Sequence, residues 1–405
     1  MRIAITSWSN RRFGGTGTYL TELCAGLLRQ GHQVAWLHER DAPTDHPRLE
    51  TGSDGPVWCI ESLGQESAIA ALRAWNPDVL FAHGFLETKH EQAALDIAPA
   101  VFLAHDYYGT CISGLKAHSL PTVQPCHRTL GWQCLASYHV RRCGGLSPVT
   151  MVREFRRQSN RLELLRRYKA IVTLSDHMRE EYLRHGFEPS RVVKVAHSVG
   201  AANTTTTPSP SRPGHDSAWR LLFVGRMYTT KGGRELIDAL PKVVRELQRR
   251  CEVTFAGDGA QRREWEARAG RLSSKEPMAS VKFAGWLQAD ALAQVYANTD
   301  LVVVPSLWPE PFGLVGLEAG MHGIPAAAFA VGGIPEWLQS GVNGHLASGS
   351  PPTSDGLADA IVACLRDEET RARLGAGARR LWSERKFERH IASLLDVFAV
   401  ARHAA

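Results

Sequence analysis

The chain has 405 residues, a formal net charge of +6, and 44% hydrophobic and 22% charged residues. This composition is typical of a globular protein and excludes a disordered or fibrous chain, and the length allows two domains of ordinary size. The mild positive charge is compatible with an anionic ligand or a membrane surface, but it does not indicate a nucleic-acid binder. The first residues, MRIAITSW, lack the pattern of a signal peptide, and no apolar run reaches the length of a membrane span. We therefore expect a cytoplasmic protein that is at most peripheral to the inner face of the membrane.

Short apolar runs recur through the first half of the chain, separated by helical or irregular stretches. Such runs, alternating with helices, predict a parallel α/β sheet. A Gly-rich loop with Gly14 and Gly15 leads into a predicted helix over 18–29. This loop resembles the G-x-G-x-x-G dinucleotide fingerprint without matching it, so a tight turn without a ligand is an equally good interpretation. The predicted strands cover residues 1–8, 33–37, 79–82, 100–104, 170–174 and 191–195.

His105 is a candidate functional residue because it directly follows the apolar run 100–104. Open α/β sheets bind their ligands at the carboxyl ends of the strands, which is where this position falls. The alternative is a buried histidine whose role is only to satisfy hydrogen bonds.

Half of the eight cysteines lie close together at Cys111, Cys126, Cys134 and Cys143, within an insertion of about residues 107–146. Their spacing contains no C-x-x-C pair and so does not match a standard zinc finger or ribbon. A long loop with little apolar periodicity cannot build its own core, and a structural zinc ion would provide one. Reduced thiols and disulfides remain alternative interpretations.

The arginine-rich segment 153–169 reads REFRRQSNRLELLRRYK and predicts an amphipathic helix. Such a helix could lie on anionic lipid, which would suit a lipid-linked substrate. A surface helix that packs one face on the protein and exposes the other is the simpler interpretation.

The Thr- and Pro-rich segment 200–218 predicts a linker, so we place one domain at 1–205 and a second at 206–385. The second half begins again with a strand, 220–224, and a turn that carries Arg226 and Lys231 before a helix over 234–249. Two fixed cations at the end of a strand can hold a diphosphate. Helices are predicted between 355 and 401.

Residues 301–330 form the most informative stretch: a strand over 301–304, a loop, a helix from Phe312–Gly313 to His322, and another apolar run. The loop-to-helix junction suits an anion because free N–H groups and the positive end of the helix dipole meet there. Glu310 precedes this helix and Glu318 lies within it. Since carboxylates repel an anion, we expect these two to accept hydrogen bonds from sugar or ribose hydroxyls. A helix cap and a solvated side chain are the alternatives for each glutamate alone.

Three motifs together resemble a known family: Glu310-x7-Glu318, Gly225-Arg226-x4-Lys231-Gly232, and His105-Asp106 after a strand. They are similar to those of retaining nucleotide-sugar glycosyltransferases with the GT-B fold, family 4 (glycosyl transferases group 1). The resemblance implies two Rossmann-like, doubly wound parallel-sheet domains that face each other across a cleft. It also implies that the last helix, at about 386–405, crosses back to the first domain.

The resemblance further implies transfer of a sugar from a nucleoside-diphosphate sugar to an acceptor hydroxyl with retention of configuration, in cell-surface polysaccharide or glycoconjugate synthesis. The acceptor would be a saccharide or a lipid-linked saccharide. Arg226 and Lys231 would hold the diphosphate, Glu310 the donor sugar and Glu318 the ribose, with His105 beside the reacting sugar. The remaining donor contacts would come from Gly14, Gly15, Gly257, Gly285, Phe312, Gly313 and Leu314.

The sequence contains no Asp-x-Asp pair of the kind that holds a metal–diphosphate, so we expect no catalytic metal. A nucleotide-sugar epimerase or phosphorylase of the same fold is an alternative, and a nucleotide-binding dehydrogenase or a non-enzymatic scaffold is a weaker one. The donor base, the donor sugar, the acceptor and the oligomeric state stay open at this stage.

Overall fold

The computed structural model describes residues 1–11, 14–43, 55–198 and 218–403 and divides into two compact units, each described by itself below. The first unit comprises Met1–Lys116, His127–Gly200 and Lys386–Ala405, and the second comprises Ala117–Cys126 and Ala201–Arg385. The predicted domain boundary at 205/206 lies outside the described residues. Within the described ranges, no helix is long and apolar enough to cross a membrane.

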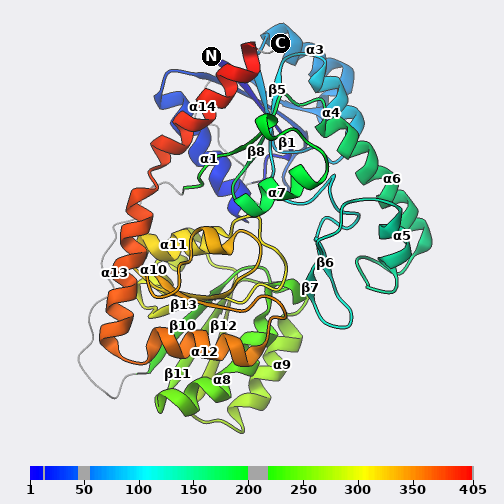
Figure 1. The fold of residues 1–405 in the computed structure, drawn as a ribbon. Helices are drawn as coiled ribbons and strands as arrows, with labels where there is room; N and C mark the ends of the chain where they lie inside the picture. The colour runs from blue at the N-terminus through cyan, green and yellow to red at the C-terminus, as the bar shows by residue number, and fades with distance from the viewer. Residues whose placement is uncertain (12–13, 44–54, 199–217, 404–405) are drawn as a thin grey trace. The chain divides into compact units, whose positions relative to one another are not determined.

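The first unit is built on a seven-stranded sheet in the order β3-β2-β1-β4-β5-β8-β9, with all neighbouring strands parallel (Figure 1). The short strands β4, β5 and β8 are buried at every position, as expected for parallel strands covered on both faces. The strands are β1 Arg2–Ser9, β2 Gln33–Arg40, β3 Val57–Cys59, β4 Val79–Ala82, β5 Ala100–Leu103, β8 Ala170–Thr173 and β9 Val192–Lys194.

Helices connect these strands, and the last helix of the chain returns to this unit. Helix α14 packs on α1 so closely that a Cβ added at Gly26 would lie 2.1 Å from the Ile391 side chain. Helix α1 begins at Gly14, earlier than the predicted start at residue 18. The helices are α1 Gly14–Arg29, α2 Ile60–Leu63, α3 Gln65–Trp75, α4 Thr88–Leu95, α5 Trp132–Tyr138, α6 Pro148–Leu165, α7 Asp176–Arg184 and α14 Phe387–His403, with a short 3-10 helix η1, Pro189–Arg191.

The cysteine-containing insertion leaves the sheet after β5 and carries a hairpin of two two-residue strands, β6 Ala117–His118 and β7 Gln124–Pro125, followed by α5. At its base the Lys116 side chain is 1% exposed and its ammonium group bonds to the Glu181 carboxylate and the Arg128 carbonyl. A buried lysine requires such partners. The insertion is therefore attached to α7 by a buried ion pair.

Helix α6 begins at Pro148, earlier than predicted, because the Ser147 hydroxyl caps it by accepting from the Thr150 N–H at 3.3 Å. The apolar residues at its end pack inward, since Leu165 and Tyr168 are fully buried. The other two apolar residues of the predicted amphipathic segment, Phe155 and Leu162, are partly buried, so this apolar side of the segment packs at least in part on the protein.

The second unit contains a six-stranded parallel sheet in the order β12-β11-β10-β13-β14-β15. Two parallel α/β units confirm the predicted fold class. The strands are β10 Trp219–Val224, β11 Cys251–Ala256, β12 Ala279–Gly285, β13 Leu301–Val304, β14 Ala326–Phe329 and β15 Gly344–Ala347. The helices are α8 Gly233–Leu247, α9 Arg262–Ser273, α10 Ala289–Ala297, α11 Leu314–His322, α12 Ser354–Leu365 and α13 Glu368–Glu384, with 3-10 helices η2 Thr229–Lys231 and η3 Ile334–Glu336.

Candidate active site

In the second sheet the strand order reverses at β10, which lies between β11 and β13. Parallel sheets bind ligands outside the carboxyl ends of their strands at such a switch point. The loop after β10 carries Arg226 and Lys231, and the loop after β13 carries Glu310. The sequence-predicted residues of this unit therefore lie along one edge of the sheet.

The two loops at the switch point are in direct contact. The Leu307 N–H donates to the Thr230 carbonyl at 2.8 Å, and a Cβ at Gly232 would lie 1.7 Å from the Pro305 carbonyl oxygen. Gly232 also has a φ of 68°, which glycine adopts without strain. The glycine that follows Lys231 therefore allows the two loops to approach.

This approach pairs Lys231 with Glu310. The Lys231 Nζ lies 2.5 Å from Glu310 Oε1, and the Ser306 hydroxyl donates to the same oxygen at 2.6 Å. Burial alone would raise the pKa of Glu310, but the Lys231 charge and the hydrogen bonds from Lys231 and Ser306 lower this pKa below its usual value. The Lys231 ammonium also lies 5.3 Å from the centre of the Trp308 ring. Glu310 is thus a buried, ionised acceptor.

Glu318 is partly buried on α11 and bonds differently. Its Oε2 accepts from the Tyr296 hydroxyl at 2.9 Å, and Tyr296 stacks on His322 with ring centres 4.9 Å apart. Burial raises the pKa of Glu318, which the Tyr296 hydrogen bond only partly offsets. The tyrosine fixes one carboxylate oxygen and leaves the group able to accept from ligand hydroxyls.

The start of α11 is shaped by Trp337. The Trp337 indole donates to the Phe312 carbonyl at 2.8 Å, and a Cβ at Gly316 would lie 2.3 Å from its ring. Phe312 is 3% exposed, whereas Gly313, with a φ of 92°, and Leu314 are partly exposed. A ligand at this helix start would therefore contact backbone rather than the Phe312 ring.

The remaining predicted residues of this unit lie on neighbouring loops of the same edge. Arg226 is exposed, with its guanidinium 5.4 Å from the centre of the Tyr228 ring. The Gly257 N–H donates to the Gly285 carbonyl at 2.7 Å, and a Cβ at Gly257 would lie 2.0 Å from the Gly225 carbonyl oxygen. The ends of β10, β11 and β12 thus present closely packed backbone.

In the first unit, His105 pairs with His83. The His83 Nδ1 lies 2.7 Å from His105 Nε2 and the two rings stack with centres 5.0 Å apart, each just beyond the carboxyl end of its strand. Burial lowers the pKa of His105 to about 4, and burial together with His105 lowers the pKa of His83 well below its usual value. Both imidazoles are therefore neutral near pH 7 and share one hydrogen bond, which fixes the orientation of His105.

Tyr19 of α1 joins further histidines to this pair. Its ring contacts His83, His105 and His197, and its hydroxyl lies 2.9 Å from His390 Nε2 in α14. The His390 Nδ1 lies 2.8 Å from the Ala196 carbonyl, and burial lowers the pKa of His390 to about 4. The C-terminal helix thus packs directly beside the residues that hold His105. Gly14 and Gly15 lie in the first turn of α1, the same helix that carries Tyr19.

The four insertion cysteines carry free thiols. None of the eight cysteines, all of which are described, forms a disulfide. Cys111 is buried and the other three insertion cysteines are partly buried. Since nothing in the structure tests zinc binding by Cys111, Cys126, Cys134 and Cys143, the structural zinc site stays a prediction.

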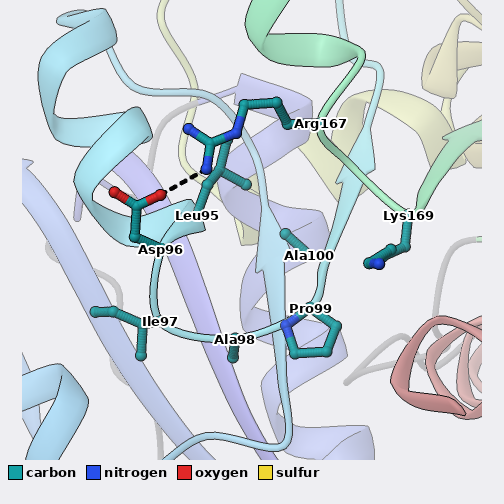
Figure 2. Close-up of a pocket in the computed structure, with 8 residues that line it drawn as sticks. All are labelled: Leu95, Asp96, Ile97, Ala98, Pro99, Ala100, Arg167 and Lys169. Carbon is teal, nitrogen blue, oxygen red and sulfur yellow. Dashed lines mark hydrogen bonds and ion pairs between the residues drawn. The ribbon is translucent and has the colours of Figure 1, made fainter. Parts of the chain in front are cut away.

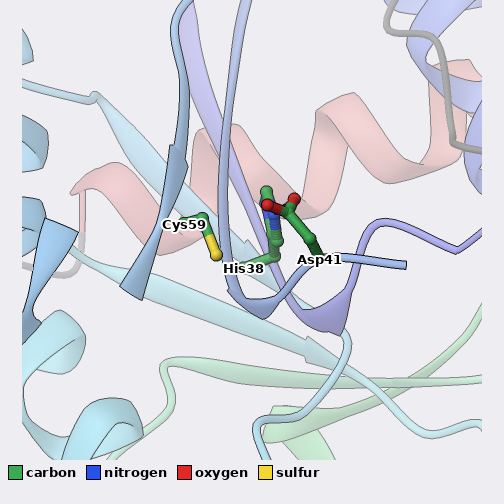
Figure 3. A group of neighbouring side chains, drawn as sticks. All are labelled: His38, Asp41 and Cys59. Carbon is green, nitrogen blue, oxygen red and sulfur yellow. Dashed lines mark hydrogen bonds and ion pairs between the residues drawn. The ribbon is translucent and has the colours of Figure 1, made fainter. Parts of the chain in front are cut away.

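Across the described ranges, one group of three metal-ligand side chains does converge, His38, Asp41 and Cys59, whose ligand atoms lie within 4.8 Å of one another (Figure 3). These groups already have hydrogen-bond partners. His38 Nε2 lies 2.9 Å from Asp41 Oδ1, the Asn10 amide donates to that same oxygen at 2.9 Å, and the Cys59 thiol donates to the Glu39 carbonyl at 3.6 Å. We interpret the group as a hydrogen-bonded network at the ends of β1, β2 and β3.

A shallow hollow of about 260 Å³ lies at the opposite edge of the first sheet, at the amino end of β5 (Figure 2). Its polar groups are Lys169 and the solvent-exposed ion pair Arg167–Asp96, with 2.5 Å between the charged atoms. Because ligands of such sheets bind at the carboxyl edge, we assign it no part in the active site.

Sequence reasoning missed His83, Tyr296, Ser306 and Trp337. A signal was present for His83, because it follows the run 79–82 just as His105 follows 100–104. The others had no comparable signal, since their roles depend on which loops and helices pack together.

Comparison with known proteins gives matches over both units of the chain. Residues 14–196 match the model of a family described as "Glycosyl transferase 4-like domain", and residues 210–381 match "Glycosyl transferases group 1". The chain is 27% identical to the glycogen synthase of Mycobacterium tuberculosis, over 99% of this chain and 95% of that protein.

Solved structures show the same fold. The sucrose-phosphate synthase of Thermosynechococcus elongatus has a TM-score of 0.69 at 18% identity, covering 100% of both chains. Anabaena HepE in complex with UDP has a TM-score of 0.66 at 21% identity, covering 98% of this chain and 99% of that one. Both extend over the two units.

Proposed function

Because the chain belongs to the group 1 glycosyltransferases with the GT-B fold, and is a nucleotide-sugar-dependent transferase, we propose that it moves a sugar from a UDP-sugar to a saccharide acceptor with retention of anomeric configuration. The observation that carries the proposal is the Lys231–Glu310 pair at the switch point of the second sheet, with Glu318 on the helix that follows. UDP is proposed because HepE, of the same fold, is solved with UDP and with UDP-glucose.

Charge stabilisation is the main contribution that this chain would make. As the sugar–phosphate bond breaks, negative charge grows on the departing diphosphate. Arg226, Lys231 and the backbone N–H groups at the start of α11 would stabilise that charge, and one such donor is typically worth about 100- to 1000-fold in rate. Glu310 orients the Lys231 ammonium, and the Ser306 hydroxyl in turn holds the Glu310 carboxylate. Gly257 and Gly285, on the neighbouring loops, would contact the base through their backbone.

The two glutamates would hold neutral hydroxyls rather than the phosphates. Glu310, whose pKa is lowered, would accept from hydroxyls of the donor sugar, and Glu318 would accept from the ribose. His105, oriented by His83, would contact the reacting sugar. Gly14 and Gly15, in the first turn of α1, would face the diphosphate and the acceptor.

Retention would follow from attack on the same face of the sugar from which the diphosphate departs. The bond from the anomeric carbon to the phosphate oxygen breaks as the bond to the acceptor oxygen forms, and the leaving phosphate oxygen takes the acceptor proton. No protein nucleophile is required. We propose that the acceptor is a saccharide of a cell-surface polysaccharide or glycoconjugate, free or lipid-linked.

The test is UDP release from UDP-glucose and other UDP-sugars by wild type, Lys231→Ala and the matched control Lys275→Ala, an exposed lysine just beyond the end of α9. We expect release by wild type and Lys275→Ala, and a loss of about 100-fold or more in Lys231→Ala. Formation of a sugar epimer, dependence on free phosphate, or turnover of NAD instead would identify one of the alternative enzymes and contradict the proposal.

A further inference from the structure

The insertion and the start of α6 expose an unusual number of apolar side chains. Of the fourteen large hydrophobic side chains exposed in the described part of the chain, five lie between residues 132 and 152. Four of these five are at least 66% exposed: Trp132 at 73%, Val140 at 72%, Leu146 at 66% and Val149 at 76%. Single exposed hydrophobic residues are ordinary, but such a concentration marks an interaction surface.

Helix α6 shows that this exposure follows a pattern. Val149, Val152, Arg153 and Arg156 are exposed and recur at the spacing of one helical face. The opposite face is buried, with Gln158 among its residues. The outward face therefore combines valines with arginines, where a purely solvated face would carry charged and polar residues alone.

The charged side chains of this region are almost all basic. Residues 127–157 contain six arginines and a single acidic residue, Glu154. The ion pairs described for this segment are those of Glu154 with Arg153 and Arg157. Arg128, Arg141, Arg142, Arg153 and Arg156 are all exposed. We call these five arginines, with Trp132, Val140, Leu146, Val149 and Val152, the α5–α6 surface.

We infer that the α5–α6 surface binds an anionic lipid bilayer. A tryptophan and aliphatic side chains flanked by arginines match the chemistry of the headgroup region, where apolar groups are buried and basic groups meet lipid phosphates. A second copy of the chain would bring arginines against arginines, and protein interfaces are depleted of charge at their centres. The inference goes beyond the proposed function and does not depend on it.

The test is co-sedimentation of the full chain with vesicles of phosphatidylcholine alone or with about one-third phosphatidylglycerol. We expect binding to the anionic vesicles that weakens as salt is added, and little binding to the neutral ones. Arg141→Gln/Arg142→Gln/Arg153→Gln should weaken binding by about 100-fold, since each basic residue near such a surface is worth about a fivefold change. Trp132→Ser/Val149→Ser should weaken it by about tenfold or more.

Matched controls change the same residue types outside the surface. Trp286→Ser/Val400→Ser removes side chains that are 48% and 71% exposed, and Arg263→Gln/Arg271→Gln/Arg389→Gln removes three exposed arginines. We expect neither control to change vesicle binding by more than about twofold. The arginine control lowers the net charge of the protein, but salt screens charges that lie away from the bilayer.

Three results would overturn the inference: no binding of wild type to anionic vesicles, equal binding to both vesicle types, or surface variants that bind as well as their controls. A concentration-dependent dimer that only the surface variants abolish would instead assign the surface to a second copy. UDP release without vesicles is measured for every variant and should be unchanged. If wild type releases no UDP yet binds vesicles through this surface, the proposed function fails and the membrane surface stands.

Discussion

Replacing Lys231 by methionine tests the buried pair on which the proposed donor site depends. The substitution keeps the length of the side chain and removes its charge, leaving the 7%-exposed Glu310 without its cation. Coulomb's law at an effective dielectric constant of 20 gives about 6.6 kcal/mol for unit charges at the 2.5 Å separation. Desolvation of both groups offsets part of this, and removal of one partner of a buried pair typically costs about 3–5 kcal/mol.

We expect the lower end of that range, about 3 kcal/mol, because the Lys231 side chain is 22% exposed. For a domain of this size that corresponds to a fall in Tm of about 6–12 °C. Calorimetry of wild type, Lys231→Met, Glu310→Gln and the double variant gives the coupling energy of the pair, with Lys275→Met as the matched control. The double variant should lose less unfolding free energy than the two single variants lose together.

The pH dependence of the unfolding free energy provides an independent test of the pair, because its direction is predicted. In wild type the folded pKa of Glu310 lies below its usual value, so the stability that the pair contributes is complete above the usual carboxyl range and is lost as pH falls through the folded pKa. In Lys231→Met, burial is expected to raise that pKa. The difference in unfolding free energy between the two proteins should therefore grow from pH 4 to pH 7. A loss under about 1 kcal/mol at pH 7, or a difference independent of pH, would refute the reasoning.

Three further predictions follow from other contacts. Glu318→Ala should weaken UDP binding about 10- to 100-fold in titration calorimetry through loss of charge-assisted hydrogen bonds, and unchanged affinity would remove it from the site. Gly316→Ala, whose Cβ would lie 2.3 Å from an indole ring, should lower stability by about 1–3 kcal/mol, whereas Gly270→Ala, with nothing within 4 Å, should not; equal Tm values would contradict this. His390 has a folded pKa of about 4 against 6.5, so stability should be lost as pH falls from 6.5 to 4. His390→Gln should reduce that loss by up to about 3 kcal/mol, and the exposed control His403→Gln should not. If wild type and both variants lose the same stability in acid, the acid sensitivity does not come from His390.

The elements that could be predicted are those with a strong local signal. The strand over 301–304 was predicted at its observed bounds because four consecutive buried aliphatic residues, three of them β-branched, leave little alternative. The end of α11 at His322 was also predicted, since Gly323 follows in a left-handed conformation with a φ of 69°. In contrast, β3 and the hairpin β6–β7 are two or three residues long and have no periodicity to detect.

The site could be predicted as a set of residues but not as a set of contacts. The sequence assigned Lys231 to the phosphate and Glu310 to the sugar as separate groups, whereas the structure joins them across a separation of 79 residues. That contact depends on β10 and β13 being neighbours and on the close approach at Gly232, which one sequence does not specify. The pairing of His83 with His105 similarly depends on β4 and β5 lying side by side.

The central claim is that a nucleoside diphosphate binds at the carboxyl edge of the second sheet, between the loops after β10 and β13. The most direct measurement is a thermal-shift panel of UDP, GDP, ADP, TDP and NAD on wild type, Arg226→Ala and the exposed control Arg263→Ala. At 100 times its dissociation constant, a bound ligand adds about 2.7 kcal/mol to stability. UDP should raise the Tm of wild type and Arg263→Ala, and of Arg226→Ala far less. If no diphosphate shifts wild type, or if NAD alone does, the account is contradicted.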